Sequence, residues 1–227
     1  MKKINILAIA LVICIALTWC GKTETITQWT ENENSTKGAT ETKTIIALGD
    51  SITAWYSLPI EDSYPSQLEV LLQNNWYDYE LINAGVSGNT SSQLLSRIDL
   101  YLEDETDIPD IALVVIWWND GLRAQSIDEM SENIIEIIEK LKEKNVEVVL
   151  WGMQIPPNNW LSYFLDFKNA YGDIAKETDV ELIDFFLEDV ATKWIYNLPD
   201  MIHPNKDGYA IIAQNTFEFL KISKKIG

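Results

Sequence analysis

The sequence is short of histidine and cysteine, and both shortages limit the chemistry that is open to it. Its 227 residues include one histidine, His203, and two cysteines, Cys14 and Cys20. Both cysteines lie within the first 20 residues, so the rest of the chain has no cysteine for a disulfide, a thiolate nucleophile or a cysteine metal site. We therefore expect no metal ion and no cofactor, and His203 is either incidental or the base of a catalytic site.

Positive charge is also scarce. The chain has 17 lysine and arginine residues against 35 aspartate and glutamate residues, which gives a net charge of −18. Nucleic-acid phosphates and anionic membrane surfaces repel such a chain, so we expect neither as a partner of the folded part. The hydrophobic content of 47% is ample for a core, and the length suits one domain with appendages.

The chain begins like an export signal. Two lysines precede an almost wholly apolar run, residues 4–17, which is shorter than the ~20 residues of a membrane-spanning helix. Residues 17–20, Leu-Thr-Trp-Cys, resemble a bacterial lipobox, which predicts lipidation at Cys20, although a small residue is expected where Trp19 stands. A plain cleaved signal and an uncleaved anchor are the alternatives. We expect an exported protein of the cell envelope, on its periplasmic or extracellular face, that contacts the membrane only through this segment.

The rest of the chain divides into a tether and one domain. Residues 21–43 are rich in Thr, Glu, Asn and Ser, which is typical of a disordered tether between the signal, residues 1–20, and a domain, residues 44–227. The expected strands of that domain are 44–48, 79–82, 111–116, 146–151 and 180–183. The expected helices are 64–72, 91–101, 128–144, 163–176 and 207–220. Such alternation is typical of a three-layer α/β/α sandwich with a parallel sheet of about five strands.

One serine lies where the first strand is expected to end. An apolar run, residues 45–48, is followed by a Gly-Asp turn and then by Ser51. Ligands bind at this edge of open α/β sheets, so Ser51 is a candidate nucleophile. Asp200 and His203 are three residues apart, so the carboxylate can hold the imidazole while the second ring nitrogen faces the serine. The alternatives are a helix-capping serine and an exposed Asp-His pair.

Five short segments, taken in order, resemble the motifs of SGNH (GDSL-type) hydrolases. They are 49–53 (Gly-Asp-Ser-Ile-Thr), 83–91, 119–123 (Asn-Asp-Gly-Leu-Arg), 152–158 and 200–205. The resemblance covers residues 44–223 and is to the branch of arylesterases and lysophospholipase/thioesterase I. It implies the flavodoxin-like fold of that family and a metal-free serine esterase.

The resemblance also implies donors for the oxyanion, the oxygen that becomes negative when a serine attacks a carbonyl. Three groups share that task in the family, and here they are the backbone N–H groups of Ser51 and Gly88 and the side-chain amide of Asn119. The residues alone favour an ordinary loop glycine at Gly88, and Asn119 also fits an Asn-Asp-Gly turn. Arg123 matches the family as well; a salt bridge is its expected role and substrate contact the alternative.

Two tryptophans depart from the family pattern. Trp117 and Trp118 stand at the glycine, and at the residue after it, of the usual Gly-x-Asn-Asp segment. An indole there narrows the pocket, displaces Asn119, or forms an aromatic wall for a ring or an acyl chain. Strand alternation sends one of the pair into the core and the other into the pocket. The candidate substrate-binding residues are Trp117, Trp118, Trp55 and Pro156, with Trp151 and Trp160 as further aromatic candidates near strand ends.

Together these observations predict a serine esterase that hydrolyses acyl esters of carboxylic acids through an acyl-enzyme. The resemblance implies short to medium acyl esters, with thioesters and lysophospholipids as further substrates. Two alternatives stay open: a carbohydrate O-deacetylase, which an aromatic pocket suits, and a ligand-binding module whose oxyanion hole the tryptophans have closed. The sequence leaves the acyl chain length, the leaving group and the oligomeric state open.

Overall fold

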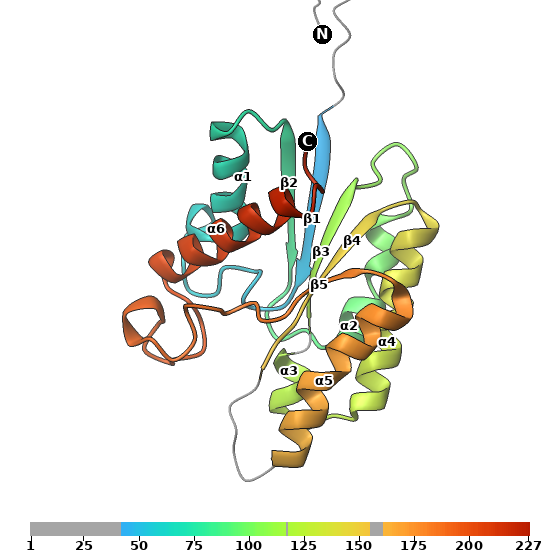
Figure 1. The fold of residues 1–227 in the computed structure, drawn as a ribbon, viewed down its shortest axis with the longest axis vertical. Helices are drawn as coiled ribbons and strands as arrows, with labels where there is room; N and C mark the ends of the chain where they lie inside the picture. The colour runs from blue at the N-terminus through green and yellow to red at the C-terminus, as the bar shows by residue number, and fades with distance from the viewer. Residues whose placement is uncertain (1–41, 117, 155–160) are drawn as a thin grey trace, which may run out of the picture. The chain divides into compact units, whose positions relative to one another are not determined.

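A five-stranded parallel sheet forms the centre of the domain, as the sequence predicts (Figure 1). The structure, a computed structural model, describes residues 42–116, 118–154 and 161–227. Its strands are β1 (Lys43–Gly49), β2 (Tyr79–Gly85), β3 (Ile111–Val115), β4 (Glu147–Trp151) and β5 (Glu181–Ile183). They lie in the order β2-β1-β3-β4-β5, and all neighbouring pairs are parallel. The predicted signal segment and nearly all of the predicted tether lie outside the described residues.

The two central strands are apolar along their length because both of their faces are covered. In β1, Ile45, Ile46 and Leu48 are buried, and all five residues of β3 are buried as well. Continuous apolar runs of this kind are typical of parallel strands with helices on each side. Lys43, which the sequence assigns to the tether, already belongs to β1, where it pairs with Tyr79 of β2.

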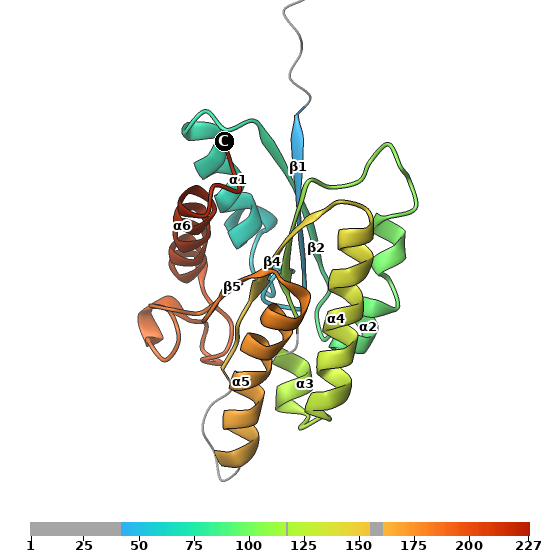
Figure 2. The same ribbon diagram turned by 45° about the vertical axis from the view of Figure 1, so that its right-hand side comes forward.

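Helices cover the two faces of the sheet, which confirms the predicted three-layer sandwich. α1 (Tyr64–Asn74) and α6 (Lys206–Ile222) lie on one face. The other face carries α2 (Ser91–Leu95), α3 (Trp118–Leu122), α4 (Ile127–Glu143) and α5 (Leu161–Thr178), as Figures 1 and 2 show. Short 3₁₀ helices occur at Ile60–Asp62, Ile98–Tyr101 and Trp194–Tyr196. None of the helices within the described ranges is long and apolar enough to cross a membrane.

Local sequence explains where several helices begin. The Ser63 side chain accepts a hydrogen bond from the Ser66 amide and caps α1, and Ser126 caps α4 in the same way through Glu129. Asn205 caps α6 by accepting from the Gly208 amide. In α4 the apolar residues recur at helical spacing and are buried against the sheet: Met130, Ile134, Ile137, Ile138 and Leu141.

One predicted helix is wrong in its extent. The sequence predicts a single helix over residues 91–101, but α2 ends at Leu95 and a separate 3₁₀ helix occupies Ile98–Tyr101. At the break, the Ser96 hydroxyl donates a 2.8 Å hydrogen bond to the Gln93 carbonyl. Serine side chains compete with the backbone in this way, which favours the end of a helix. The break lets Arg97 turn back toward the end of β1.

The order of the strands places a switch point between β1 and β3. From β1 the chain proceeds to β2 on one side and then to β3 on the other. In open α/β sheets of this order, ligands bind outside the carboxyl ends of the strands at that point. Gly49 ends β1 and pairs with Val115 at the end of β3. The residues that follow these two strands therefore lie together at the binding edge.

Candidate active site

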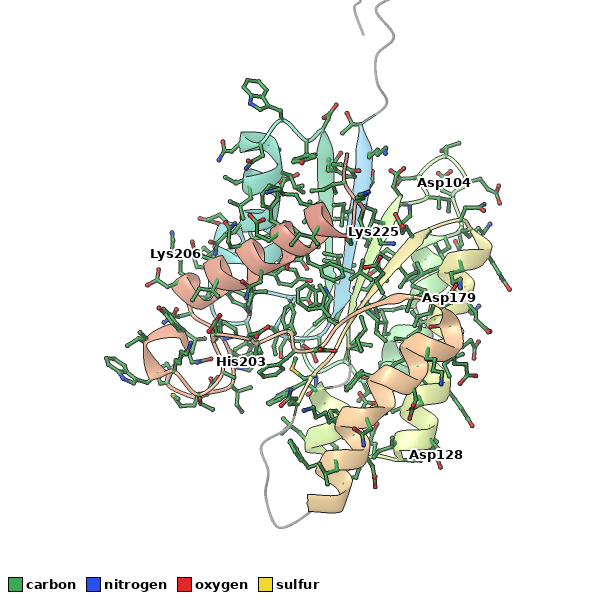
Figure 3. The ribbon with its side chains drawn as sticks, viewed as in Figure 1. Asp104, Asp128, Asp179, His203, Lys206 and Lys225 are labelled. Carbon is green, nitrogen blue, oxygen red and sulfur yellow. The ribbon has the colours of Figure 1, made fainter. Side chains whose placement is uncertain are left out.

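A chain of hydrogen bonds joins a hydroxyl, an imidazole and a carboxylate at this edge. The Ser51 Oγ lies 2.9 Å from Nε2 of His203. The other ring nitrogen, Nδ1, lies 2.7 Å from Oδ2 of Asp200. Ser51 follows β1, whereas Asp200 and His203 lie in the turn before α6. Figure 3 shows His203 on the side where the strands end and Asp104 toward their opposite ends.

The turn that carries Asp200 and His203 is held by the carboxylate itself. Oδ1 of Asp200 accepts the amide N–H groups of Ile202 at 2.9 Å and of His203 at 3.0 Å. Met201 takes a positive φ of 61°, which closes the turn. Burial acts to raise the pKa of Asp200, but the two amides and the His203 ring outweigh it and hold that pKa below its usual value. Asp200 is therefore a carboxylate at neutral pH and can orient the imidazole.

A tyrosine that the sequence did not single out lies against the imidazole. The ring of Tyr56 stacks on the ring of His203 with a centroid distance of 4.4 Å and an angle of 28° between planes. The only signal in the sequence is that Tyr56 follows Ser51 by five residues, and nothing local tells that the two segments meet His203.

The turn after β1 presents Ser51 at the edge of the sheet. The carbonyl of Asp50 accepts the Ala54 amide at 2.9 Å, and the Ser51 carbonyl accepts the Tyr56 amide at 3.2 Å. Gly85, at the end of β2, lies under this turn. A Cβ at residue 85 would lie 2.4 Å from the Ala54 nitrogen, so the turn can approach β2 only where that residue is glycine.

The structure brings the three predicted oxyanion donors to one region. The Nδ2 of Asn119 donates to the Asn89 carbonyl at 2.9 Å and lies 3.5 Å from Oδ2 of Asp50. Asn119 therefore lies beside the residues next to Gly88 and Ser51. The contact to Asp50 is long and weak, so a substrate oxygen can displace it. Within the described part of the chain, neither the Ser51 amide nor the Gly88 amide donates to another residue.

Gly88 takes a backbone conformation that favours glycine. Its φ is +82°, in the left-handed region, and no atom lies within 4 Å of where its Cβ would be. The carbonyl of Gly88 accepts a 3.3 Å hydrogen bond from Nη2 of Arg123. The expected salt bridge of Arg123 is wrong for the described residues, because none of their carboxylates lies within ion-pair distance of it. A carbonyl at the site takes that place.

Asp50, the neighbour of the candidate nucleophile, is a buried carboxyl group. It is 2% exposed. Burial raises the pKa of Asp50 to about 7, the amide of Ile52 opposes that rise, and the charge of nearby Asp120 adds to it. The folded protein therefore holds this proton more tightly than the unfolded chain does.

This difference predicts how stability depends on pH. Because the folded pKa of Asp50 lies above the unfolded value of 3.8, its ionisation costs stability progressively as pH rises from that value to about 7. Asp50→Asn removes the cost. We expect the free energy of unfolding of the variant, relative to the wild type, to rise by about 2–4 kcal/mol between pH 4 and pH 8 in urea titrations. An equal difference at both pH values contradicts this account, because packing changes do not depend on pH.

An apolar cavity of about 470 Å³ lies beside the segments that carry Asn119 and His203. Trp118, which precedes Asn119, forms part of it, and so do Met201 and Ile202, which lie between Asp200 and His203. Most of its lining is aliphatic or aromatic, and its size lies within the range of small-molecule sites. Its described lining residues are Trp118, Gln154, Phe164, Phe185, Leu187, Ala191, Thr192, Asn197, Met201 and Ile202.

The structure places only some of the tryptophans that the sequence proposes for the substrate. Trp118 lines the apolar cavity and is 6% exposed, so its side chain belongs both to the hydrophobic core and to the cavity wall. The prediction from strand alternation is wrong for Trp118, because β3 ends at Val115 and Trp118 begins α3. Trp151 packs edge-on against Phe186 in the core. Trp55 is half-buried after the nucleophile turn and does not line this cavity. Trp117, Pro156 and Trp160 lie outside the described residues.

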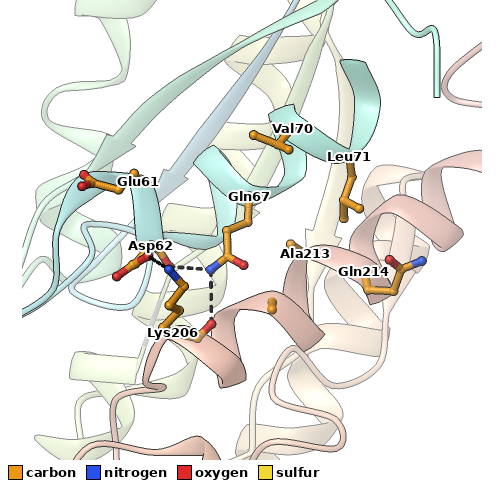
Figure 4. Close-up of a pocket in the computed structure, with 9 residues that line it drawn as sticks. Glu61, Asp62, Gln67, Val70, Leu71, Lys206, Ala213 and Gln214 are labelled. Atoms are coloured by element: carbon orange, nitrogen blue, oxygen red, sulfur yellow. Dashed lines mark hydrogen bonds and ion pairs between the residues drawn. The ribbon is translucent and has the colours of Figure 1, made fainter. Parts of the chain in front are cut away.

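A second hollow lies between α1 and α6 (Figure 4). Nε2 of Gln67 donates to the carbonyls of Asp62 at 2.7 Å and Lys206 at 3.2 Å, and Lys206 pairs with the Asp62 carboxylate at 2.8 Å. These contacts fix the first residue of α6, three positions after His203. No group of three or more potential metal ligands gathers anywhere in the described residues.

The fold and this arrangement define a class: serine hydrolases built on a three-layer α/β domain. Residues 47–211 match the GDSL-like lipase/acylhydrolase family. An arylesterase from Vibrio mimicus is 34% identical over 170 residues, 75% of this chain and 84% of the relative. The thioesterase 1/protease 1/lysophospholipase L1 of Escherichia coli is 34% identical over 171 residues, 75% of this chain and 79% of the relative.

Solved structures agree with the sequence comparison. The psychrotrophic esterase EstA from Pseudoalteromonas sp. superimposes with a TM-score of 0.76 at 31% identity, over 81% of this chain and 99% of that one. The chain therefore belongs to the GDSL-like lipase/acylhydrolase (SGNH hydrolase) family and is a carboxylic ester hydrolase. The family resemblance seen in the sequence is confirmed.

Proposed function

We propose that Ser51 is the nucleophile of an acyl-ester hydrolase, activated by His203. The observation that carries the proposal is the continuous hydrogen-bonded chain from Ser51 Oγ through the imidazole to Asp200. As Oγ bonds to the ester carbonyl carbon, Nε2 of His203 takes the hydroxyl proton. Asp200 accepts the Nδ1–H, which holds the ring in the required tautomer and stabilises the imidazolium.

The developing oxyanion is bound by three donors at the switch point. The amide N–H groups of Ser51 and Gly88 are not used by other described residues, and the Asn119 amide is held beside them by the Asn89 carbonyl. Each such donor contributes about 10²–10³ in turnover when it is aimed at the oxyanion rather than at the ground-state carbonyl.

The reaction is completed by two proton transfers through the same imidazole. When the tetrahedral intermediate collapses, the bond from carbon to the leaving oxygen breaks and Nε2 of His203 protonates that oxygen, which releases the alcohol. Water then attacks the acyl-enzyme while His203 takes one of its protons, and the proton returns to Ser51 Oγ as the carboxylic acid leaves. No redox partner is required.

The apolar cavity supports an acyl group as the bound part of the substrate. Its wall at Met201 and Ile202 is continuous in sequence with His203, and its wall at Trp118 is continuous with Asn119. A sugar needs more hydrogen-bonding groups than Gln154, Thr192 and Asn197 supply, so the cavity favours acyl esters over a carbohydrate acetyl ester. Thioesters and lysophospholipids present the same acyl chain and belong to the proposed substrate class.

A series of p-nitrophenyl esters, from acetyl to palmitoyl, tests both the chemistry and the cavity. We expect the wild type to hydrolyse short to medium esters and Ser51→Ala to lose at least about 10⁴ in kcat. Trp118→Ala enlarges the cavity, so kcat/KM moves toward longer acyl chains. Each further buried methylene adds about 0.8 kcal/mol, or roughly fourfold in kcat/KM.

Trp194→Ala is the matched control for the Trp118 variant. Trp194 is 77% exposed and does not line the apolar cavity, so its removal leaves the chain-length optimum unchanged. An unchanged optimum in Trp118→Ala, with the protein folded, contradicts the assignment of the cavity. Activity retained by Ser51→Ala contradicts the proposed nucleophile. A folded wild type that a fluorophosphonate does not label supports a binding module instead.

We also propose that the enzyme is exported and held at the cell envelope through its N-terminal segment. The basic start, the apolar run and Cys20 support this, and they lie outside the described residues. Intact-mass analysis of the protein from the membrane fraction tests it. A diacylated N-terminal cysteine is the expected result, and an uncleaved, unmodified N-terminus contradicts lipidation.

A further inference from the structure

One arginine joins the end of β1 to the loop that follows β2. The guanidinium of Arg97 donates from Nη2 to the Gly49 carbonyl at 3.1 Å and from Nε to Oδ1 of Asn89 at 2.8 Å. Its third nitrogen, Nη1, donates to the Tyr101 hydroxyl at 2.6 Å. All three nitrogens of the side chain are therefore committed.

The charge of Arg97 has no carboxylate partner among the described residues. Their ion pairs all involve lysines or His203, and Arg97 takes part in none. A partly buried arginine whose donors all end on neutral oxygens is unusual, because arginines in such places commonly pair with carboxylates. An uncompensated cation beside the site favours negative charge that develops there.

The two oxygens that Arg97 holds belong to the segments that carry the proposed oxyanion donors. Gly49 is two residues before Ser51, and Asn89 follows Gly88 directly. The carbonyl of Asn89 in turn accepts the Asn119 amide at 2.9 Å. One side chain thus connects the nucleophile turn, the glycine loop and, through Asn89, the asparagine.

We propose that Arg97 is the positioning residue of the oxyanion hole. It holds the three donors in fixed positions relative to one another, and its positive charge favours the transition state over the bound ester. The inference rests on the proposed function, because it assigns Arg97 to the same reaction. A lysine cannot replace it, since a single ammonium cannot reach Gly49, Asn89 and Tyr101 with the fixed geometry of a guanidinium.

The test compares Arg97→Gln and Arg97→Lys with the wild type on one short p-nitrophenyl ester. Complete loss of one oxyanion donor costs about 10²–10³, so loosening of the set is expected to lower kcat by about 10–10² while KM changes little. Lys140→Met is the matched control. Lys140 pairs on the surface with Asp99, two residues from Arg97, and we expect its loss to leave kcat unchanged.

A tetrahedral inhibitor separates positioning from a general structural role. An alkylboronic acid bonds to the serine oxygen and places a negative oxygen where the oxyanion forms. We expect its Ki to rise in the Arg97 variants by the same factor by which kcat/KM falls, while the active-site titre of folded protein stays constant. A fall in titre that accounts for the whole loss of activity overturns the proposal.

The outcomes also separate this inference from the proposed function. If Ser51→Ala is inactive and Arg97→Gln keeps the wild-type kcat, only the role of Arg97 is overturned. If Ser51→Ala is active, the proposed function is overturned. If Arg97→Gln does not fold, Tyr101→Phe decides, because it removes only the hydroxyl that orients the guanidinium. We then expect kcat to fall by up to about fivefold, and an unchanged kcat and boronate Ki overturn the proposal.

Discussion

Replacing His203 by glutamine lowers kcat by about 10⁴-fold or more on a short acyl ester. The glutamine amide fills a similar space but cannot take the proton from Ser51 Oγ, which lies 2.9 Å from Nε2 in the wild type. Since His203 is the one histidine of the chain, no neighbouring imidazole can substitute for it. The residual rate comes from the oxyanion donors and from binding, so KM changes far less than kcat.

Steady-state kinetics with p-nitrophenyl butyrate at about pH 8 measures this loss. Asp189→Asn is the control, because Asp189 pairs with Lys193 on the surface and takes no part in the triad. Circular dichroism and a urea titration show whether the His203 variant remains folded. A kcat within tenfold of the wild type, in a folded variant, contradicts the assignment of the general base.

The second large effect concerns stability. Gly85→Ala places a Cβ about 2.4 Å from the Ala54 nitrogen and 2.7 Å from the Thr53 carbonyl carbon. Both are backbone atoms of the turn that presents Ser51, so no side chain can rotate away. We expect the free energy of unfolding to fall by about 3 kcal/mol and Ser51, the proposed nucleophile, to shift, with loss of activity.

Gly172→Ala is the matched control for the glycine variant. Gly172 lies within α5, and no atom comes within 4 Å of where its Cβ would be. Alanine there is expected to raise the free energy of unfolding by about 0.5–1 kcal/mol, because glycine weakens helices. Urea unfolding measures both variants. If Gly85→Ala is as stable as the wild type, the close approach of the turn to β2 is not required.

The sequence predicts those parts of the site that depend on residue type and on strand ends. Ser51 follows a strongly apolar strand, and the single histidine, three residues after an aspartate, leaves few other candidates for the general base. The α/β alternation predicts all five strands, because parallel strands are buried on both faces and their apolar runs are clear. The helix α4 is equally clear from its period of buried isoleucines.

The parts that the sequence does not predict depend on tertiary contacts. Tyr56 meets His203 only because the β1 turn and the loop before α6 come together. Arg97 reaches Gly49 only because the helix breaks at Ser96, and Arg123 binds a carbonyl instead of the carboxylate expected from its charge. Helix propensity and charge pairing are local rules, and tertiary contacts at the carboxyl end of the sheet override them here.

The short helix α3 is another feature that local rules miss. Five residues give little helical period, and the preceding apolar strand suggests that alternation continues through the tryptophans. The strand instead ends at Val115, and Trp118 enters a helix whose second residue is Asn119. Trp118, which stands one residue after the position of the family's usual glycine, therefore becomes a wall of the apolar cavity without removing Asn119 from the site.

Fluorophosphonate labelling of the full chain, followed by mapping of the adduct by peptide mass spectrometry, tests the central claim most directly. The solved structure of EstA is of an esterase inhibited by monoethylphosphonate. The account predicts one adduct, on Ser51, and none in Ser51→Ala or in protein unfolded in urea before labelling. An adduct on another residue, or labelling that persists in Ser51→Ala, contradicts it.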